Sequence, residues 1–271
     1  MSQGSGTAHL GLAWTIARRE LRSGLQGFRI FLVCLVIGVT AIAAVGTLSS
    51  AVERGLSSEG RPLLGGDLEF SVIHRTLSIK ERLFLETRGE VSLVATLRAM
   101  AQAGAERSLI ELKAVDVSYP LFGTLSLDRD IPLQDALSRK DGRWGGVAES
   151  LLLQRLGIPG GGTIRVGEAA IQIPAAILPE PDRVADGSIL GPPLMETHDA
   201  LEATGLLKPG SLVAYRYRLA LKGDPTPEAI RAIRDGANAA FPDAGWNIRT
   251  RDRAAPGVGR FIDRLALFLT L

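Results

Sequence analysis

The chain has 271 residues, 46% of them hydrophobic, and carries a net charge of +2 at neutral pH. This composition excludes a disordered chain, and the near-neutral charge with 5% aromatic residues gives no electrostatic footprint for nucleic acid. The single cysteine, Cys34, lies inside an apolar run, which excludes an intrachain disulfide and a zinc site built on cysteines.

The stretch between Arg29 and Glu53 contains no charged side chain. Its core, residues 30–48, is almost wholly apolar, and as a helix it would be roughly 28 Å long, close to the ~30 Å of bilayer hydrocarbon. A cleaved signal peptide is the alternative, but such apolar regions are shorter, at about 7–15 residues, and the small-residue pattern at 41–43 lies in mid-run. We predict a retained transmembrane helix over residues 29–52.

Charged residues flank this run unevenly. Before the run, four arginines face a single acid, Glu20; just after it, two acids balance two arginines. The four arginines are Arg18, Arg19, Arg22 and Arg29. Because positive residues stay on the cytoplasmic side, we expect residues 1–28 in the cytoplasm and the following domain outside the membrane. Residues 12–21, with Trp14 as an anchor, are typical of an amphipathic interfacial helix, and a merely basic flank is the alternative.

Small side chains gather on one side of the predicted membrane helix. At 100° per residue they are Thr40, Ala44, Thr47 and Ala51. Membrane helices approach one another through small residues, so this stripe favours contact with further helices. The opposite side is the candidate lipid face, with Phe31, Leu35, Ile42 and Val45. Small residues are also common in membrane helices generally, so the alternative is that the stripe has no packing role.

Residues 53–256 are predicted to form an extracytoplasmic α+β domain, because strands and helices mix there without strict alternation. The expected strands are 68–73, 91–100, 108–115, 146–148, 163–166, 170–177, 213–221 and 246–250. The expected helices are 78–88, which opens on a Ser78/Glu81 capping box, 151–156, and 226–240, which begins with Thr-Pro. Pro174 indicates a sheet edge or a bulge, and residues 178–193 are predicted to be a long exposed loop.

No pattern in the sequence assembles a catalytic, cofactor or metal site. The glycines at 157–162 lack the lysine of a phosphate loop and no helix follows, so they indicate a turn. The histidines His9, His74 and His198 are scattered without metal-ligand spacing, and no nucleophile has an identifiable base. Glu180 and Asp182, in the predicted loop, are interpreted as solvated acids.

Three clusters are interpreted as structural features. Residues 64–67 (LGGD) turn the chain into the first strand, after a helix that we expect to continue from residue 53 and to be broken by Pro62 and the two glycines. Residues 119–123 (YPLFG) form an aromatic turn, for which core packing is favoured over an exposed contact patch. Residues 257–271 are predicted to be a stalk and the beginning of a second transmembrane helix.

The order of these pieces carries a resemblance to a known family. In chain order they are 17–22 (ARRELR), the apolar run, LGGD, YPLFG, 151–157 (LLLQRLG) leading into 163–166 (TIRV), and 260–265 (RFIDRL). The set resembles the amino-terminal part of an ABC transporter permease of the FtsX/MacB superfamily, in its YbbP-like branch. The resemblance covers nearly the whole chain from about residue 12.

The resemblance implies a membrane subunit whose ATP-binding partner is a separate chain and whose external domain is of the MacB periplasmic core type. It implies movement of a hydrophobic or lipid-linked cargo driven by the partner's ATP hydrolysis, and no catalytic residue in this region. It also implies further permease helices, so the chain is expected to be a fragment. A single-pass anchored binding or sensor module is the alternative, and an anchored hydrolase has the least support.

Overall fold

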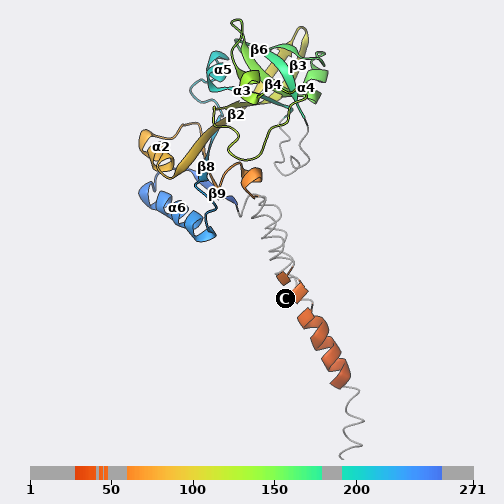
Figure 1. Ribbon diagram of the computed structural model, residues 1–271, viewed down its shortest axis with the longest axis vertical. Coiled ribbons are helices and arrows are strands. Elements are labelled where there is room, and N and C mark those ends of the chain that lie inside the picture. Colours follow the sequence, from red (N-terminus) through yellow and green to blue (C-terminus); the bar gives the residue numbers. More distant parts are fainter. Residues whose placement is uncertain (1–27, 41–42, 45, 48–59, 179–190, 252–271) are drawn as a thin grey trace, which may run out of the picture. The chain divides into compact units, whose positions relative to one another are not determined.

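The computed structural model describes residues 28–40, 43–44, 46–47, 60–178 and 191–251. The chain divides into two compact units, Met1–Arg54 with Gly257–Leu271 and Gly55–Pro256. In the first unit, residues 28–40 form a helix (Figure 1). Among the described residues no helix combines the length and hydropathy that crossing a membrane requires. The predicted span over 29–52 includes positions outside the described residues and stays a prediction, as do the tail over 1–28 and the stalk over 257–271.

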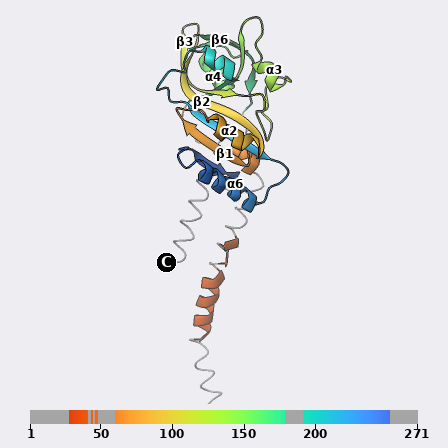
Figure 2. The same ribbon diagram turned by 90° about the vertical axis from the view of Figure 1, so that its left-hand side faces the viewer.

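The second unit begins with a ferredoxin-like lobe, visible in Figures 1 and 2 as the part that carries α2 and α6. Its four strands lie in the order β2-β8-β1-β9, and every neighbouring pair is antiparallel. The chain order β1-α2-β2 and then β8-α6-β9 makes this a split βαβ arrangement. The elements are β1 (Leu68–Ile73), α2 (Ile79–Glu86), β2 (Gly89–Ala103), β8 (Ala214–Leu221), α6 (Pro227–Ala240) and β9 (Asn247–Thr250).

Both helices cover one face of this sheet. Alternate β1 side chains, among them Phe70, join Leu85 from α2 and Ile230 from α6 in one buried cluster. Each helix starts where the sequence predicts it: Ser78 and Glu81 form a reciprocal capping box, and Thr226 caps α6 with a proline in its first turn. The capping residues near each helix start therefore determine where the two helices of this layer begin.

Five strands inserted between β2 and β8 form a closed ring of six strands together with β2. Around the ring, β2 pairs with β3, then β7, β4, β6 and β5 follow, and β5 returns to β2. Closure removes the exposed sheet edges that would otherwise invite strand addition. The remaining strands are β3 (Glu106–Val115), β4 (Trp144–Glu149), β5 (Gly162–Val166), β6 (Ala169–Ile177) and β7 (Pro193–Thr197).

The long strand β2 belongs to both lobes. Its first half pairs with β8 and its second half with β3 over ten residues, the two pairings overlapping at Val94–Thr96. Inside the barrel the core consists of alanines and branched aliphatic residues such as Leu112 and Ile171, and it is closed by α4 (Ser150–Arg155) and α5 (His198–Ala203). A second apolar layer lies outside the barrel, where α3 (Leu133–Leu137) and the chain before it cover Val147 and Met195.

The structure confirms an α+β domain and the bulge alternative at Pro174, and it corrects the predictions at Pro62, β7, and the helices α3 and α5. Helical residues 60–64 continue through Pro62, and the helix ends at Gly65, whose φ of 71° suits a helix C-terminus. Pro174 lies in β6, which is paired on both sides and not at an edge; the register shift beside it confirms a bulge. Strand β7 begins at Pro193, at the end of the predicted loop, and helices α3 and α5 were not predicted.

Candidate functional site

The described part of the second unit begins and ends at one place. Gly60 leads into the lobe and Arg251 leaves it after β9, and these two residues touch: a Cβ on Gly60 would collide with the carbonyl oxygen of Arg251. The backbone N–H of Arg251 in turn donates to the carbonyl of Asp67, 3.0 Å away. The two connections of this unit to the rest of the chain therefore meet. We call this place the junction.

Asp67 is the centre of the junction and is fully buried. Its Oδ1 accepts from Arg61 Nε at 2.7 Å and from an Arg251 terminal nitrogen at 3.2 Å, and its Oδ2 accepts from the Leu221 N–H at 2.9 Å. Both carboxylate oxygens are thus satisfied, by one arginine from each connection and by strand β8. A buried carboxylate held this way cannot lose one partner without leaving charge unpaired.

The two arginines are held by further contacts on the chain that precedes α6. Arg61 donates to the Gly223 carbonyl at 2.7 Å, and Arg251 donates to the Pro225 carbonyl at 2.8 Å. Arg251 also pairs with the exposed carboxylate of Asp224 at 2.9 Å. That hydrogen bond, with the charge of Arg251 and then of Arg61, lowers the pKa of Asp224. The exposed Asp224 thus offsets part of the arginines' charge, and the buried Asp67 holds both guanidinium groups in place.

The sequence LGGD explains why the chain can turn tightly here. The Gly65 N–H donates to the Arg61 carbonyl at 2.7 Å, and Gly65 has a positive φ of 71°. A Cβ at Gly65 would also press on the Arg218 guanidinium, and one at Gly66 would lie 3.1 Å from the Leu219 carbonyl oxygen. Glycines are required because the backbone passes this close to β8. The predicted turn into the first strand is confirmed.

A second buried acid continues the charge pattern along β1. Glu69 is 3% exposed and lies 3.5 Å from a nitrogen of Arg218 on β8 and 3.5 Å from one of Arg249 on β9. Glu69 thus holds arginines from the strands on both sides of β1, and Asp67, just before β1, holds one arginine from each connection. This side of the sheet, opposite the helices, is organised by charge.

The aromatic turn YPLFG reaches the same junction. The Arg61 guanidinium lies 5.1 Å from the centre of the Phe122 ring, and Gly123 approaches Pro62. Tyr119 packs in the apolar layer outside the barrel, and Lys113 donates to its hydroxyl at 2.8 Å. Tyr119 thus packs as the favoured interpretation predicts, whereas Leu121 and Phe122 are half-buried and Gly123 is exposed. Sequence reading separated YPLFG from LGGD, and the fold brings them together at Arg61.

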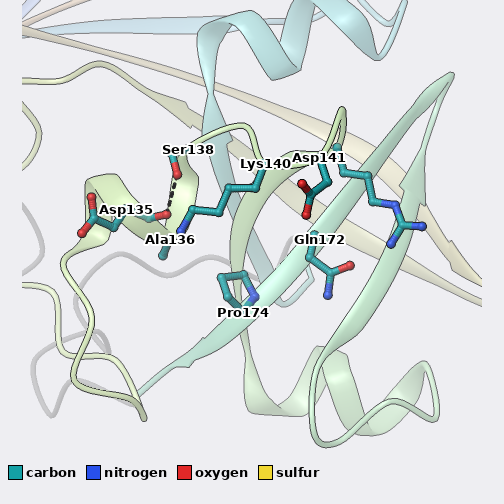
Figure 3. A pocket seen from close by; sticks show the side chains of 9 residues that line it. Asp135, Ala136, Ser138, Lys140, Asp141, Gln172 and Pro174 are labelled. Atoms are coloured by element: carbon teal, nitrogen blue, oxygen red, sulfur yellow. Dashed lines mark hydrogen bonds between the residues drawn. The ribbon is translucent and has the colours of Figure 1, made fainter.

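A cavity of about 290 Å³ lies elsewhere, beside α3 and β6 (Figure 3). Its polar lining mixes both signs of charge: Asp135, Ser138, Lys140, Asp141, Arg143 and Gln172. The one hydrogen bond drawn between its lining residues runs from Ser138 Oγ to the Asp135 carbonyl, 2.7 Å. Its polar side chains are exposed or half-buried, so the cavity does not present the desolvated, convergent groups that distinguish a ligand site.

The remaining sequence candidates are dispersed. His74 and His198 each contact a backbone carbonyl at 3.0 Å, those of Ser211 and Leu93 respectively. No group of three potential metal ligands occurs within the described ranges. The glycines at 157–162 form the predicted turn between α4 and β5. His9, Glu180 and Asp182 lie outside the described residues.

Comparison with known proteins gives one relative in sequence. No family model matches the chain. Over 203 residues the chain is 29% identical to the uncharacterized ABC transporter permease YbbP of Escherichia coli (strain K12), a match that covers 74% of this chain and 24% of YbbP. The chain is thus similar in sequence to one part of an ABC transporter permease. The resemblance predicted from the order of the motifs is confirmed, and the chain spans about a quarter of the permease that it matches.

Two solved structures show a distant likeness to this chain. The periplasmic region of MacB from Actinobacillus actinomycetemcomitans is 11% identical, with a TM-score of 0.47 over 75% of this chain and 95% of that one. The extracellular domain of the transporter YknZ from Gram-positive bacteria is 11% identical, with a TM-score of 0.46 over 68% and 100%. At these scores the likeness indicates nothing about activity, and the strand pairings above define the fold.

Proposed function

We propose that this permease chain converts movement of two membrane-directed segments into movement of an external domain. Under this proposal a separate ATP-binding subunit drives the segments, and the external domain moves a hydrophobic or lipid-linked cargo. The observation that supports it is the junction, where Arg61 and Arg251 share the buried carboxylate of Asp67.

The physical argument concerns how a force is distributed. A domain joined to two segments at separate places would swivel when one segment moved. Here both connections contact the same oxygen atom, and that atom is fixed to the sheet because the other carboxylate oxygen accepts from Leu221 on β8. Displacement of either connection therefore loads β1, β8 and β9 together, and the lobe moves as one body.

The proposed setting follows from the charge pattern and from the permease relationship. Residues 1–28 lie in the cytoplasm, residues 29–52 span the inner membrane, residues 53–256 form a periplasmic domain of the MacB core type, and 257–271 start the return. Further permease helices, an ATP-binding subunit and membrane lipid are the proposed partners. The domain itself needs no catalytic residue, cofactor or metal for this role.

Reporter fusions test the setting. A periplasm-active phosphatase fused after residue 58 and another fused after residue 259 should both be active in intact cells. A cytoplasm-active reporter at the same two positions should be silent. Cytoplasmic signal from both positions would disprove the topology on which the proposal depends.

The coupling role is tested in the whole permease bound to its ATP-binding subunit. Asp67→Asn keeps the shape of the side chain and removes the charge that both arginines share. We expect the complex to assemble and hydrolyse ATP while loss of the transport-dependent phenotype approaches that of a deletion strain. Asp235→Asn, at an exposed ion pair on α6, is the matched control. Full transport by the Asp67 variant would disprove the junction's role.

A further inference from the structure

The chain between β3 and α3 forms a strap across the outside of the domain, which we define as residues 116–131. Its start is fixed to the strand that both lobes share: Asp116 accepts from Ser92 Oγ at 2.8 Å and from the Leu93 N–H at 2.5 Å. The Gln134 amide donates to the carbonyls of Asp116, Val117 and Tyr119, at 3.2–3.4 Å. The first part of the strap is therefore held in place by side chains.

The middle of the strap touches the junction. Phe122 lies under the Arg61 guanidinium, the same group whose Nε contacts Asp67. Tyr119, three residues earlier, has the Arg218 guanidinium 6.0 Å from its ring centre. Arg61 thus joins the incoming chain to the strap as well as to the buried acid.

The end of the strap is attached to the barrel. The Asp128 N–H donates to the Ala176 carbonyl at 2.9 Å, the Ala176 N–H donates to Asp128 Oδ1 at 2.7 Å, and the Leu178 N–H donates to the Ser126 carbonyl at 2.9 Å. These bonds fix the strap to the last residues of β6, immediately after the Pro174 bulge. Leu125 and Leu127 complete the apolar layer outside the barrel.

We propose that the strap is a conformational coupling element that links the junction to β6 of the barrel through the Arg61–Phe122 contact. Movement of the incoming chain displaces Phe122, and the strap passes that displacement to the bulged end of β6. The two ends of the strap are fixed by hydrogen bonds, whereas Phe122 meets the junction through its ring contact with the Arg61 guanidinium. Phe122 is therefore the part of the strap that moves first.

The coupling should reach the outer layer of the barrel and leave its interior in place. The strap packs on residues such as Val147 and Ile177, which belong to the outer cluster. The interior cluster, with Ile164 and Ile171, lies on the other side of the same strands and does not touch the strap. Close packing makes that interior resistant to small displacements.

Amide hydrogen exchange of the full chain in detergent micelles tests the proposal. Phe122→Leu keeps an apolar side chain but removes the ring contact with the Arg61 guanidinium. We expect exchange of the Asp128, Ala176 and Leu178 amides to become about two- to fivefold faster. The Ile164 amide in β5 should exchange at the wild-type rate. Arg61→Lys, which keeps a cation beside Asp67 but lacks the planar group, should have the same pattern.

A matched control is available on α2, where the Arg88 guanidinium lies 3.4 Å from the centre of the Phe84 ring. Arg88→Lys removes a similar contact outside the strap and should leave the Asp128, Ala176 and Leu178 amides unchanged. Faster exchange confined to 119–123 would overturn the proposal, as would an equal rise in β5. The coupling role of the strap rests on the proposed transport function. The exchange pattern does not depend on the membrane topology, so the exchange experiment and the reporter-fusion experiment can fail separately.

Discussion

Asp67, just before β1 in the ferredoxin-like lobe, and Glu196, on β7 in the barrel, are both fully buried. Asp67 contacts two arginines and a backbone N–H. The two carboxyl oxygens of Glu196 have no hydrogen-bond partner among the described residues, and its register neighbours on β3 and β4 are Ala114 and Gly146. The lobe that receives the chain connections thus uses buried charge to fix its position, whereas the barrel is held by apolar packing and tolerates a neutral acid.

Loss of the charge on Asp67 should produce the largest effect. Asp67→Asn leaves Arg61 and Arg251 without their shared counter-charge, and breaking a buried pair costs about 3–5 kcal/mol of unfolding free energy. Denaturant unfolding of the chain in detergent, followed by Trp246 fluorescence after Trp14 and Trp144 are replaced by phenylalanine, measures it. The exposed Asp235→Asn control should cost under ~0.5 kcal/mol. Equal losses in both variants would contradict the comparison.

Glu196 should make the stability of the domain depend on pH. Burial raises the pKa of Glu196 from 4.5 to about 8. Between these values the folded state binds a proton that the unfolded state has lost, so stability falls as pH rises through this window and levels off above about 8. Each pKa unit corresponds to about 1.4 kcal/mol, which makes the full cost a few kcal/mol.

Glu196→Gln removes this pH-dependent cost. The variant should match the wild type near pH 5 and unfold at a higher temperature than the wild type at pH 9, as measured by the Trp144 signal of the barrel. Glu168→Gln, an exposed acid at the start of β6, controls for general charge effects. A wild-type midpoint at pH 9 equal to or above that of Glu196→Gln would show that Glu196 has a partner when ionised.

Sequence reading succeeded where signals are local and failed where pairing is distant. The Ser78 capping box and the Thr226-Pro227 helix start lie within four residues and were predicted correctly. The Arg251–Asp67 contact spans 184 residues, and nothing in either neighbourhood identifies the partner. The barrel depends on the parallel pairings β3–β7 and β4–β6, which hydrophobic alternation does not specify. Strand β7 was missed because its short sequence follows a Pro/Gly-rich stretch and contains Glu196.

The Arg75–Glu81 pair, in which Glu81 is buried and Arg75 is partly exposed, should contribute less than the junction. Glu81 contacts both terminal nitrogens of Arg75 at 2.9 Å and accepts from the Ser78 N–H at 2.7 Å. The Arg75 hydrogen bond, chiefly, lowers the pKa of Glu81, so its contribution is present above pH 4.5 and is lost as pH falls below it. Glu81→Gln should cost about 1–2 kcal/mol at pH 7 and have less effect near pH 3. A pH-independent cost would assign the effect to helix capping alone.

The smallest predicted effects come from two hydroxyls on the shared strand β2, and they should have opposite signs. Ser92, in the half that pairs only with β8, donates to Asp116 at 2.8 Å, whereas the buried Thr96 hydroxyl, beside β3, has no partner among the described residues. Ser92→Ala should cost about 1 kcal/mol because it leaves a carboxylate oxygen short of a donor. Thr96→Val has the same shape and removes an unsatisfied group, so it should stabilise the domain by up to about 1 kcal/mol. Equal destabilisation of both variants would show that the presence or absence of a hydrogen-bond partner does not distinguish the Ser92 and Thr96 positions of β2. The difference between the two lobes would then rest on Asp67 and Glu196 alone.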